Sequence, residues 1–252
     1  MTAAAQTTAD ARRDMGAFDL TLLPEALDEA YAFQDDYVAA VGEVAGYKMA
    51  VNGAPQMAHF GVSEPVCARV FKAQVHASGV ALPRHSFSSL SVEPEITAIL
   101  GEGVQDITAP VDQAGALALI DRFHASIELI DQRGFSVPQL KLPQAVALNV
   151  FNAGCVLGEA HIAPADLDLA AMHVTSHDDG ALMGGATNNP PQHPVEAVMW
   201  LLNNLLARGI KAQPGMLVMC GTHLPLRTLE PDVKEVSIAM AGLGTVDFTL
   251  TD

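Results

Sequence analysis

Hydrophobic and polar residues follow two different periods along the chain, and these periods predict its secondary structure. Alternation at every second position, bounded by turn residues, predicts strands; the clearest of them cover residues 46–51, 91–100, 167–187, 215–221, 235–242 and 244–250. Within 167–187, the pair Asp179-Gly180 predicts a hairpin turn. Apolar positions at helical spacing predict helices over 24–43 and 194–208, the second bounded by Pro194 and Gly209.

The remaining segments are less regular. Residues 63–74 predict a turn followed by a loop or a short helix, and residues 111–124 predict a helix. Residues 126–131 fit either a continuation of that helix or a strand. Pro94 predicts an edge strand or a bulge at 91–100, because proline has no N–H for the sheet ladder. Helices and strands interleave without a regular order, so we expect an α+β fold.

The charge balance excludes two classes of partner. The chain of 252 residues has 13 lysines and arginines against 29 aspartates and glutamates, and its formal net charge is −16. Proteins that bind nucleic acid or anionic membrane surfaces do so with basic side chains, so we expect no nucleic acid and no membrane partner. Half of the residues are hydrophobic, which is enough for a sizeable core.

The cysteines and the N-terminus indicate a cytoplasmic protein. The three cysteines are far apart and odd in number, which fits free thiols better than disulfides or a zinc site. The first residues contain no apolar run, and no later segment is long and apolar enough to span a bilayer. We expect a disordered or extended N-terminus (1–20), a small helical lobe (21–65) and a main core (66–252).

Two acidic residues stand one residue apart in the strand at 91–100. Glu93 and Glu95 share one face, since side chains alternate between faces along a strand. One interpretation is a half-solvated strand whose polar face meets water. The other is a divalent-metal site, because a hard cation such as Mg²⁺ binds carboxylate oxygens and offsets their mutual repulsion. Glu128 is the best candidate for a third ligand, although it also fits one more acid on a polar face.

Other polar residues have competing interpretations. Lys48 lies among apolar neighbours, where it could extend its charge to water or hold a substrate carboxylate or an enolate oxygen. His173 and His177 would be about 13 Å apart on a strand, too far to share a metal. The GLG at 242–244 lacks the strand-to-helix context of a dinucleotide fingerprint. We therefore expect neither a metal shared by His173 and His177 nor a dinucleotide-binding site at 242–244.

Nine short motifs occur along the chain in one order. They are EAYAFQ, GYKM, GVSEP, VEPEI, IELID, NAGCVLG, HPVEAVMWLLNNL, LVMCGT and GLGTV. The ordered set resembles the family of 2-oxopentenoate hydratases and 4-oxalocrotonate decarboxylases, within the fumarylacetoacetate hydrolase superfamily. The resemblance covers most of the chain from residue 25 onward. It implies the α+β fold of that superfamily's C-terminal domain, a mixed β-sheet roll or barrel with flanking helices.

The resemblance also implies a site. In the family, a divalent metal, usually Mg²⁺ and alternatively Mn²⁺, is bound by two glutamates of an E-x-E strand and one of an I-E-x-x-D segment. These glutamates match Glu93, Glu95 and Glu128, and the lysine of the family's GYK motif matches Lys48, which we assign a catalytic and substrate-binding role. The remaining implied substrate contacts match Asn149, Gly221 and Thr222.

The implied activity is that of a metal-dependent lyase acting on a small unsaturated 2-oxo acid. Such an acid can chelate the metal through its carboxylate and keto oxygens, so that the developing enolate is stabilised. Family hydratases usually have an acid where this chain has Val66, which favours decarboxylation of a 2-oxo-3-enedioate; hydration of 2-oxopent-4-enoate is the alternative. Leu148, at a position that usually holds an aspartate, and the extra residues NNPPQ indicate an altered pocket.

Other hypotheses stay open at this stage. Carbon–carbon hydrolysis and oxaloacetate decarboxylation are further reactions of the superfamily. A different class is a non-catalytic partner subunit, with Val66 and Leu148 as marks of a decayed site, although the retained glutamates and Lys48 argue against it. We expect a homo-oligomer, and association with a related hydratase or decarboxylase is a second option.

Overall fold

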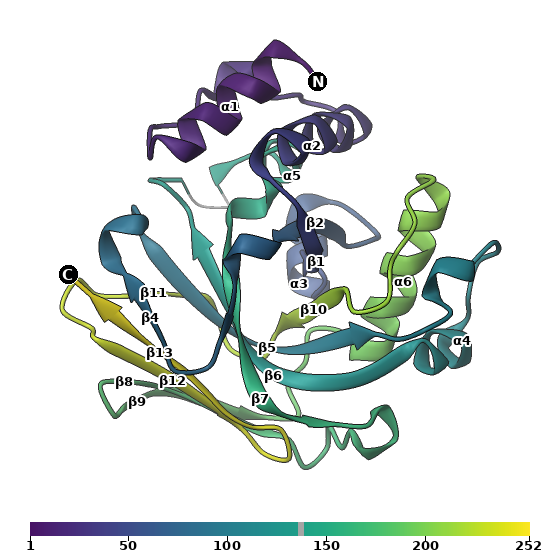
Figure 1. Cartoon of the computed structure of the whole chain (residues 1–252), viewed down its shortest axis with the longest axis vertical. Helices are drawn as coiled ribbons and strands as arrows, with labels where there is room; N and C mark the ends of the chain where they lie inside the picture. The colour runs from purple at the N-terminus through teal and green to yellow at the C-terminus, as the bar shows by residue number, and fades with distance from the viewer. Residues whose placement is uncertain (136–138) are drawn as a thin grey trace.

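Two β-sheets pack against each other and form the frame of the molecule. The computed structural model describes residues 1–135 and 139–252 (Figure 1). The first sheet is 8-stranded, in the order β2-β1-β10-β5-β6-β7-β3 with β11 beside β5. Its strands are β1 (Val44–Ala50), β2 (Val66–Phe71), β3 (Val75–Ala77), β5 (Leu90–Leu100), β6 (Ile120–Asp131), β7 (Asn152–Ile162), β10 (Leu217–Thr222) and β11 (Arg227–Thr228).

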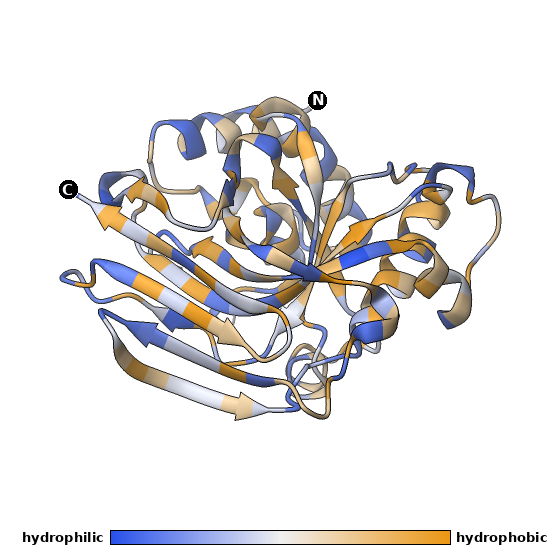
Figure 2. Ribbon diagram, turned by 60° about the horizontal axis from the view of Figure 1, so that its bottom comes forward, coloured by the Kyte–Doolittle hydropathy of each residue, from blue (hydrophilic) through white to orange (hydrophobic). Residues whose placement is uncertain are grey.

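The second sheet is 5-stranded, in the order β4-β13-β12-β8-β9. Its strands are β4 (Val80–Pro83), β8 (His173–Asp178), β9 (Ala181–Thr187), β12 (Glu235–Met240) and β13 (Gly244–Thr251). Buried and more exposed residues alternate along β8, β12 and β13, and Figure 2 shows hydrophobic and hydrophilic residues alternating on this sheet, whereas β9 has no buried residue. One face therefore packs on the first sheet and the other faces outward, as a period of two requires.

Helices cover the first sheet. They are α1 (Ala3–Arg13), α2 (Leu27–Val41), α3 (Ala54–Phe60), α4 (Gln113–Ala118), α5 (Leu142–Ala147) and α6 (Pro194–Ala207). Figure 1 shows α1 and α2 at one end of the molecule, and α6 beside β10 and β5. No helix in the described ranges is long and apolar enough to cross a bilayer.

The hydrophobic core has two main parts. The larger part lies between the two sheets and under α6, and includes Ile96, Phe123 and Leu201. The second part joins α1, α2 and α5 to β2, and includes Tyr37 and Val66. The predicted α+β fold, a mixed-sheet roll with flanking helices, is confirmed.

Several predicted elements differ in detail. The helix predicted over 24–43 begins at Leu27, and the helix predicted over 111–124 is reduced to α4. Residues 126–131 are part of β6. Residues 63–74, predicted to be a loop or short helix, contain β2, all six of whose residues are buried. A strand buried on both faces lacks the polar alternation that marks a strand in the sequence.

The N-terminus and the first domain boundary also differ from the sequence-based expectation. Residues 3–13, predicted to be disordered or extended, form helix α1, in which Ala5 and Ala9 are buried. Alanine has high helix propensity but low hydrophobicity, so this small buried face gives only a weak signal. The boundary predicted at residue 65 assigns β1 to a separate lobe, whereas β1 pairs with both β2 and β10. The rest of the domain division stays a prediction.

Pro94 lies in a central strand rather than an edge strand. β5 is between β10 and β6, and the edge prediction is therefore wrong. The bulge prediction fits better, because the β10–β5 register shifts between Met219 and Thr222. The Pro94 carbonyl accepts a hydrogen bond from the His223 amide (2.9 Å) at this irregularity. The irregularity lies beside Glu93 and Glu95, where the functional site is found.

Candidate metal centre and substrate cavity

Strands β5 and β6 bring the three predicted glutamates together. Glu93 lies directly opposite Glu128 in the antiparallel ladder, and Glu95 lies opposite Ser126, one position further along the same face. Paired residues on one face of neighbouring strands have closely spaced side chains. One carboxylate oxygen from each glutamate lies within 4.8 Å of the other two. The structure therefore brings together the three glutamates that the sequence analysis proposed as one cluster.

The face that carries these carboxylates is buried. Glu95 and Glu128 are each 1% exposed, and Glu93 is half-buried. On the opposite face of β5, Val92 and Ile96 belong to the main core. The alternative interpretation, a strand with one solvated face, is wrong because water has little access to Glu95 and Glu128.

Lys48 is the cation of the cluster. Its side chain is 2% exposed, and its Nζ forms an ion pair with Glu128 and donates to the Val150 carbonyl (3.0 Å). β1 is held in the sheet between β2 and β10, which fixes the direction of the Lys48 side chain. The interpretation in which Lys48 extends to water is therefore wrong.

Three carboxylates around one ammonium leave the cluster with excess negative charge. Burial and the nearby Glu128 carboxylate raise the pKa of Glu93 to about 8, although Lys48 acts in the opposite direction. Burial, Glu128 and Glu93 also raise the pKa of Glu95 well above its usual range. Each shift has the same cause, which is a buried carboxylate without a matching positive charge. A divalent cation would supply that charge.

Gly221 supports Glu95 from β10. The Gly221 amide donates to Glu95 Oε2 (2.8 Å), and the residue has a φ of +110°, a region that favours glycine. A Cβ at this position would lie 2.6 Å from Asn52 Nδ2 and 2.6 Å from Pro191 Cγ. Asn52 itself donates to the Cys220 carbonyl (2.8 Å). Asn52 and Pro191 therefore leave room only for glycine at the residue that orients Glu95.

Gly221→Ala is expected to lower both stability and Mg²⁺ affinity. The methyl group would displace Asn52 or Pro191 and shift the amide away from Glu95, at a cost of about 1–3 kcal/mol in the free energy of unfolding. Gly215→Ala is the matched control, because Gly215 also has a positive φ (+80°) but nothing within 4 Å of an added Cβ. Denaturant unfolding and Mg²⁺ titration would check this prediction. Equal Mg²⁺ affinity in the two variants would contradict the supporting role of Gly221.

The Val150 carbonyl that accepts from Lys48 lies in a left-handed turn at residues 149–151. Asn149, Val150 and Phe151 have φ values of 52°, 37° and 56°, which are unfavourable for residues other than glycine. The Asn149 side chain holds this turn to β2 through the Arg69 backbone, accepting from its N–H (2.7 Å) and donating to its C=O (2.8 Å). Strained backbone of this kind is typical of functional sites.

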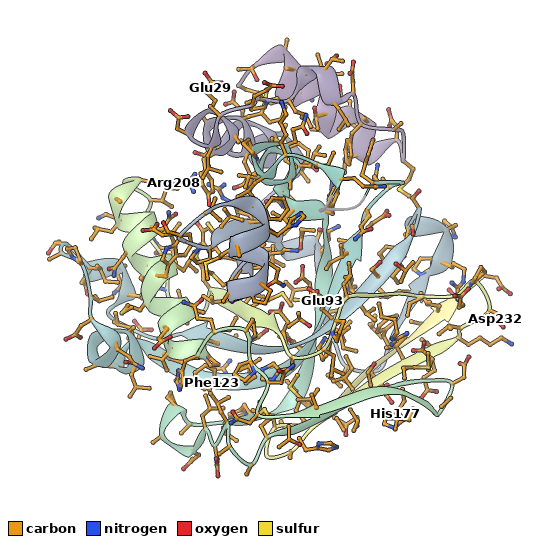
Figure 3. The ribbon with its side chains drawn as sticks, turned by 180° about the vertical axis from the view of Figure 1, so that it is seen from behind. Glu29, Glu93, Phe123, His177, Arg208 and Asp232 are labelled. Carbon is orange, nitrogen blue, oxygen red and sulfur yellow. The ribbon has the colours of Figure 1, made fainter. Side chains whose placement is uncertain are left out.

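A cavity of about 380 Å³ opens above the carboxylates. Its inner wall contains the three glutamates, Lys48, Gly221 and Thr222. The rest of its lining comes from the 49–52 segment and α3, and from Ile130, Gln132, Val150 and Leu226. Figure 3 shows Glu93 near the middle of the molecule, beside the end of α3. A concave, mostly apolar space with a few converging polar groups is the usual form of a small-molecule site.

Three predicted site residues do not line this cavity. Val66 and Leu148 are buried in the second hydrophobic cluster. Both polar atoms of the Asn149 side chain are used by the Arg69 backbone, so a direct substrate contact by Asn149 is not supported. Val66 is behind the cavity wall. Its identity therefore does not favour decarboxylation over hydration.

Gly221 and Thr222 do line the cavity, but their polar groups are already engaged. The Gly221 amide bonds to Glu95, and the Thr222 hydroxyl donates to the Leu224 carbonyl. Their role is therefore to shape the wall and hold Glu95 rather than to donate freely to a ligand. Asn52, Gln56 and Gln132 are cavity residues that the sequence analysis missed, since isolated amides carry no distinguishing sequence signal.

Three histidines, His59, His193 and His223, lie next to the nine motifs or within them, and of these only His59 lines the cavity. It lies on α3 and is exposed. His193 caps α6, with Nδ1 accepting from the Val195 amide (3.2 Å). His223 is 1% exposed, and burial lowers its pKa to about 4, so it stays neutral. His59 is therefore the one of these three histidines that could contact a ligand in the cavity, which the sequence alone did not indicate.

Without metal, the protein is expected to lose stability as the pH rises. The pKa of Glu93 is 4.5 as a free side chain and about 8 in the fold, so the folded state holds the proton more tightly. The stability from this group is complete below 4.5 and is lost as the pH passes through about 8. Mg²⁺ should remove the loss, because it replaces the proton. Thermal midpoints measured with chelator and with Mg²⁺, in wild type and Glu93→Gln, would show whether this slope depends on Glu93.

The amino-acid sequence is similar to those of several known enzymes. No family model matches the chain. The chain is 28% identical over 218 residues to a 2-hydroxyhexa-2,4-dienoate hydratase of Comamonas testosteroni, covering 84% of this chain and 81% of that protein. It is 26% identical over 206 residues to a 4-oxalocrotonate decarboxylase of a Pseudomonas species, covering 82% of this chain and 78% of the relative.

Solved structures agree on the fold. The 4-oxalocrotonate decarboxylase from Pseudomonas putida G7, complexed with calcium and acetate, superposes with a TM-score of 0.85 at 21% identity. The match covers 99% of this chain and 96% of that one. A second structure of that decarboxylase, complexed with magnesium and adipate, gives a TM-score of 0.79 at 19% identity. The resemblance inferred from the nine motifs is confirmed.

Proposed function

We propose that this chain, a relative of the 2-oxopentenoate hydratases and 4-oxalocrotonate decarboxylases, is a divalent-metal-dependent lyase acting on a small unsaturated 2-oxo acid. The observation that carries the proposal is the buried cluster of Glu93, Glu95 and Glu128, with Lys48 beside it, on the inner wall of a cavity. The reaction is either decarboxylation of a 2-oxo-3-enedioate or hydration of a 2-hydroxydienoate. The relatives include both activities, and neither is favoured by the geometry.

The three glutamates fit Mg²⁺, or Mn²⁺, as the resident ion. They offer only oxygen ligands, which these ions prefer. Among the described residues, Lys48 is the one cation paired with any of the three carboxylates, and the raised pKa values of Glu93 and Glu95 fit this lack of positive charge. When bound, such an ion supplies Lewis-acid chemistry at a carbonyl oxygen. The site geometry also leaves an open side toward the cavity for water and substrate.

We assign Lys48 a role at the substrate's oxygen atoms. An ammonium group has three N–H donors, and two of them are used by Glu128 and the Val150 carbonyl. The third can donate to the 2-oxo oxygen as negative charge develops on it. Because Lys48 is buried, this interaction is stronger than it would be in water. Lys48 therefore holds the enolate oxygen or delivers a proton to it.

The two reactions share the dienolate and differ in the bond that breaks or forms. In decarboxylation, the bond between the tail carboxylate and its neighbouring carbon breaks, its electron pair enters the conjugated system, and CO₂ leaves. Protonation of the enolate oxygen then gives the 2-hydroxydienoate. In hydration, the dienol is first protonated at its terminal carbon to give a 2-oxo-3-enoate. Water then adds, with its hydroxyl at C4 and a proton at C3.

Product identification by NMR would test the proposal and separate the two reactions. The chain would be given 2-oxohex-3-enedioate and, separately, 2-hydroxypenta-2,4-dienoate, with Mg²⁺ or with chelator. Mg²⁺-dependent release of CO₂ from the first, or of a 4-hydroxy-2-oxo acid from the second, is expected. Absence of both products while a related hydratase in the same buffer is active would contradict the proposal and favour a non-catalytic subunit. A cytoplasmic location and a homo-oligomeric state stay predictions.

A further inference from the structure

The charges around the cavity are concentrated at its inner end. Lys48 is the one lysine or arginine among the described residues that line it, and its charge is already paired with Glu128. The three residues outside the described ranges are Ser136, Val137 and Pro138, which carry no charge. Besides Lys48 and the three glutamates, His59 is the one titratable side chain of the described lining.

A charge count shows what the site can accept. The charges of three carboxylates, one ammonium and one divalent cation cancel. A 2-oxo acid bound by its carboxylate end brings the net charge to −1. A second carboxylate at the far end of the substrate would add another negative charge, within a chain of net charge −16. Such a charge needs its own partner when it leaves water.

The outer part of the cavity offers no such partner. Apart from Lys48, the glutamates and His59, the lining includes the apolar Phe60, Ile130 and Leu226 and the neutral amides of Asn52, Gln56 and Gln132. A lysine does lie beyond His59 and Phe60, in a neighbouring hollow, but this Lys141 does not line the cavity, and its exposed side chain is next to Glu25 (2.7 Å). The tail of a bound substrate therefore meets apolar side chains and neutral amides.

We propose that the cavity selects 2-oxo acids whose tail carries no carboxylate that persists through the reaction. This inference rests on the proposed function, because it takes the carboxylate end of the ligand to bind at the three glutamates. Two substrate classes satisfy it: monocarboxylic 2-hydroxydienoates with a short apolar tail, and diacids whose tail carboxylate leaves as CO₂. For the second class, an apolar wall favours loss of the charge, because neutral CO₂ needs no partner. Hydration of a diacid that keeps both carboxylates is excluded.

Binding of two stable analogues would test the inference without turnover. The chain with Mg²⁺ would be titrated by calorimetry with 2-oxohexanoate and with 2-oxoadipate, which have six carbons each and differ in the tail carboxylate. Both are saturated, so neither can react by the proposed chemistry. We expect 2-oxohexanoate to bind at least about tenfold more tightly. Equal or tighter binding of 2-oxoadipate would overturn the inference while leaving the proposed function intact.

Failure of the proposed function would give a different result. If neither analogue binds in the presence of Mg²⁺, the carboxylate end is not recognised at the glutamates, and both proposals fall together. Chelator should abolish the binding of 2-oxohexanoate. Retention of that binding in chelator would likewise contradict both.

Variants at the mouth of the cavity would identify the cause of the selectivity. Leu226→Arg should invert the preference in favour of 2-oxoadipate, because it places a cation in the apolar wall at an exposed position that tolerates the change. Leu226→Met is the control for altered shape and should keep the wild-type order. His59→Asn should also keep it, which would show that a protonated histidine does not recognise the tail. An unchanged preference in Leu226→Arg would contradict a charge-based origin.

Discussion

Replacing Glu95 with glutamine is expected to weaken Mg²⁺ binding by ~100-fold or more and to abolish turnover, because a ligand charge is lost from the centre of the cluster. Glu95 is 1% exposed and accepts a hydrogen bond from the Gly221 amide (2.8 Å). Glutamine keeps the shape of the side chain and an oxygen that accepts from Gly221. The substitution therefore removes charge without removing the hydrogen bond.

Stability measurements would separate loss of the metal from loss of the fold. In the metal-free protein, Glu95→Gln removes one of three crowded carboxylates, so its thermal midpoint should be equal to or higher than that of wild type. With Mg²⁺ the order should reverse, since wild type gains stability from bound metal and the variant does not. Glu102→Gln is the matched control, because Glu102 is exposed just beyond β5. Wild-type Mg²⁺ affinity in Glu95→Gln would contradict the assignment of Glu95 as a ligand.

Lys48→Met is expected to reduce the turnover rate by ~10²–10⁴-fold while Mg²⁺ still binds. The substitution removes the N–H donor that faces the substrate, but it leaves all three carboxylates in place. Without metal it should also destabilise the protein by about 3–5 kcal/mol, because Glu128 is left buried without its partner. Mg²⁺ should restore most of this loss. Turnover kinetics, metal titration and denaturant unfolding would be measured on one preparation.

A surface lysine provides the comparison for Lys48. Lys72 is paired with Glu43 (2.9 Å), but both side chains are more than half exposed. An exposed ion pair contributes about 0–1 kcal/mol, so Lys72→Met should leave stability and rate close to wild type. Unchanged kinetics in Lys48→Met would show that the lysine has only a structural role.

The cluster of acids could be predicted from the sequence because alternate residues of a strand lie on the same face of the sheet. Alternation along residues 91–100 assigns Glu93 and Glu95 to one side, and the motif resemblance supports Glu128 and Lys48, which are already candidates from the residues alone. The sequence does not encode which strands are neighbours. The register that places Glu93 opposite Glu128 therefore became visible only in the fold.

The parts that could not be predicted depend on tertiary contacts. Nothing in the sequence around Val150 indicates a left-handed turn, since a β-branched residue is among the least suited to positive φ. The turn is held by Asn149, whose partner Arg69 is 80 residues away along the chain. For the same reason the motif comparison assigned Asn149 and Val66 to the pocket, whereas the fold places them behind its wall.

The most direct test of the metal centre is a diffraction experiment at the manganese absorption edge, on crystals grown with Mn²⁺ and 2-oxohexanoate. We predict a single strong anomalous peak in the cavity, bounded by carboxylate oxygens of Glu93, Glu95 and Glu128, with the 2-oxo and carboxylate oxygens of the ligand against it. A cavity without an anomalous peak, or a peak that none of these three glutamates contacts, would contradict the account.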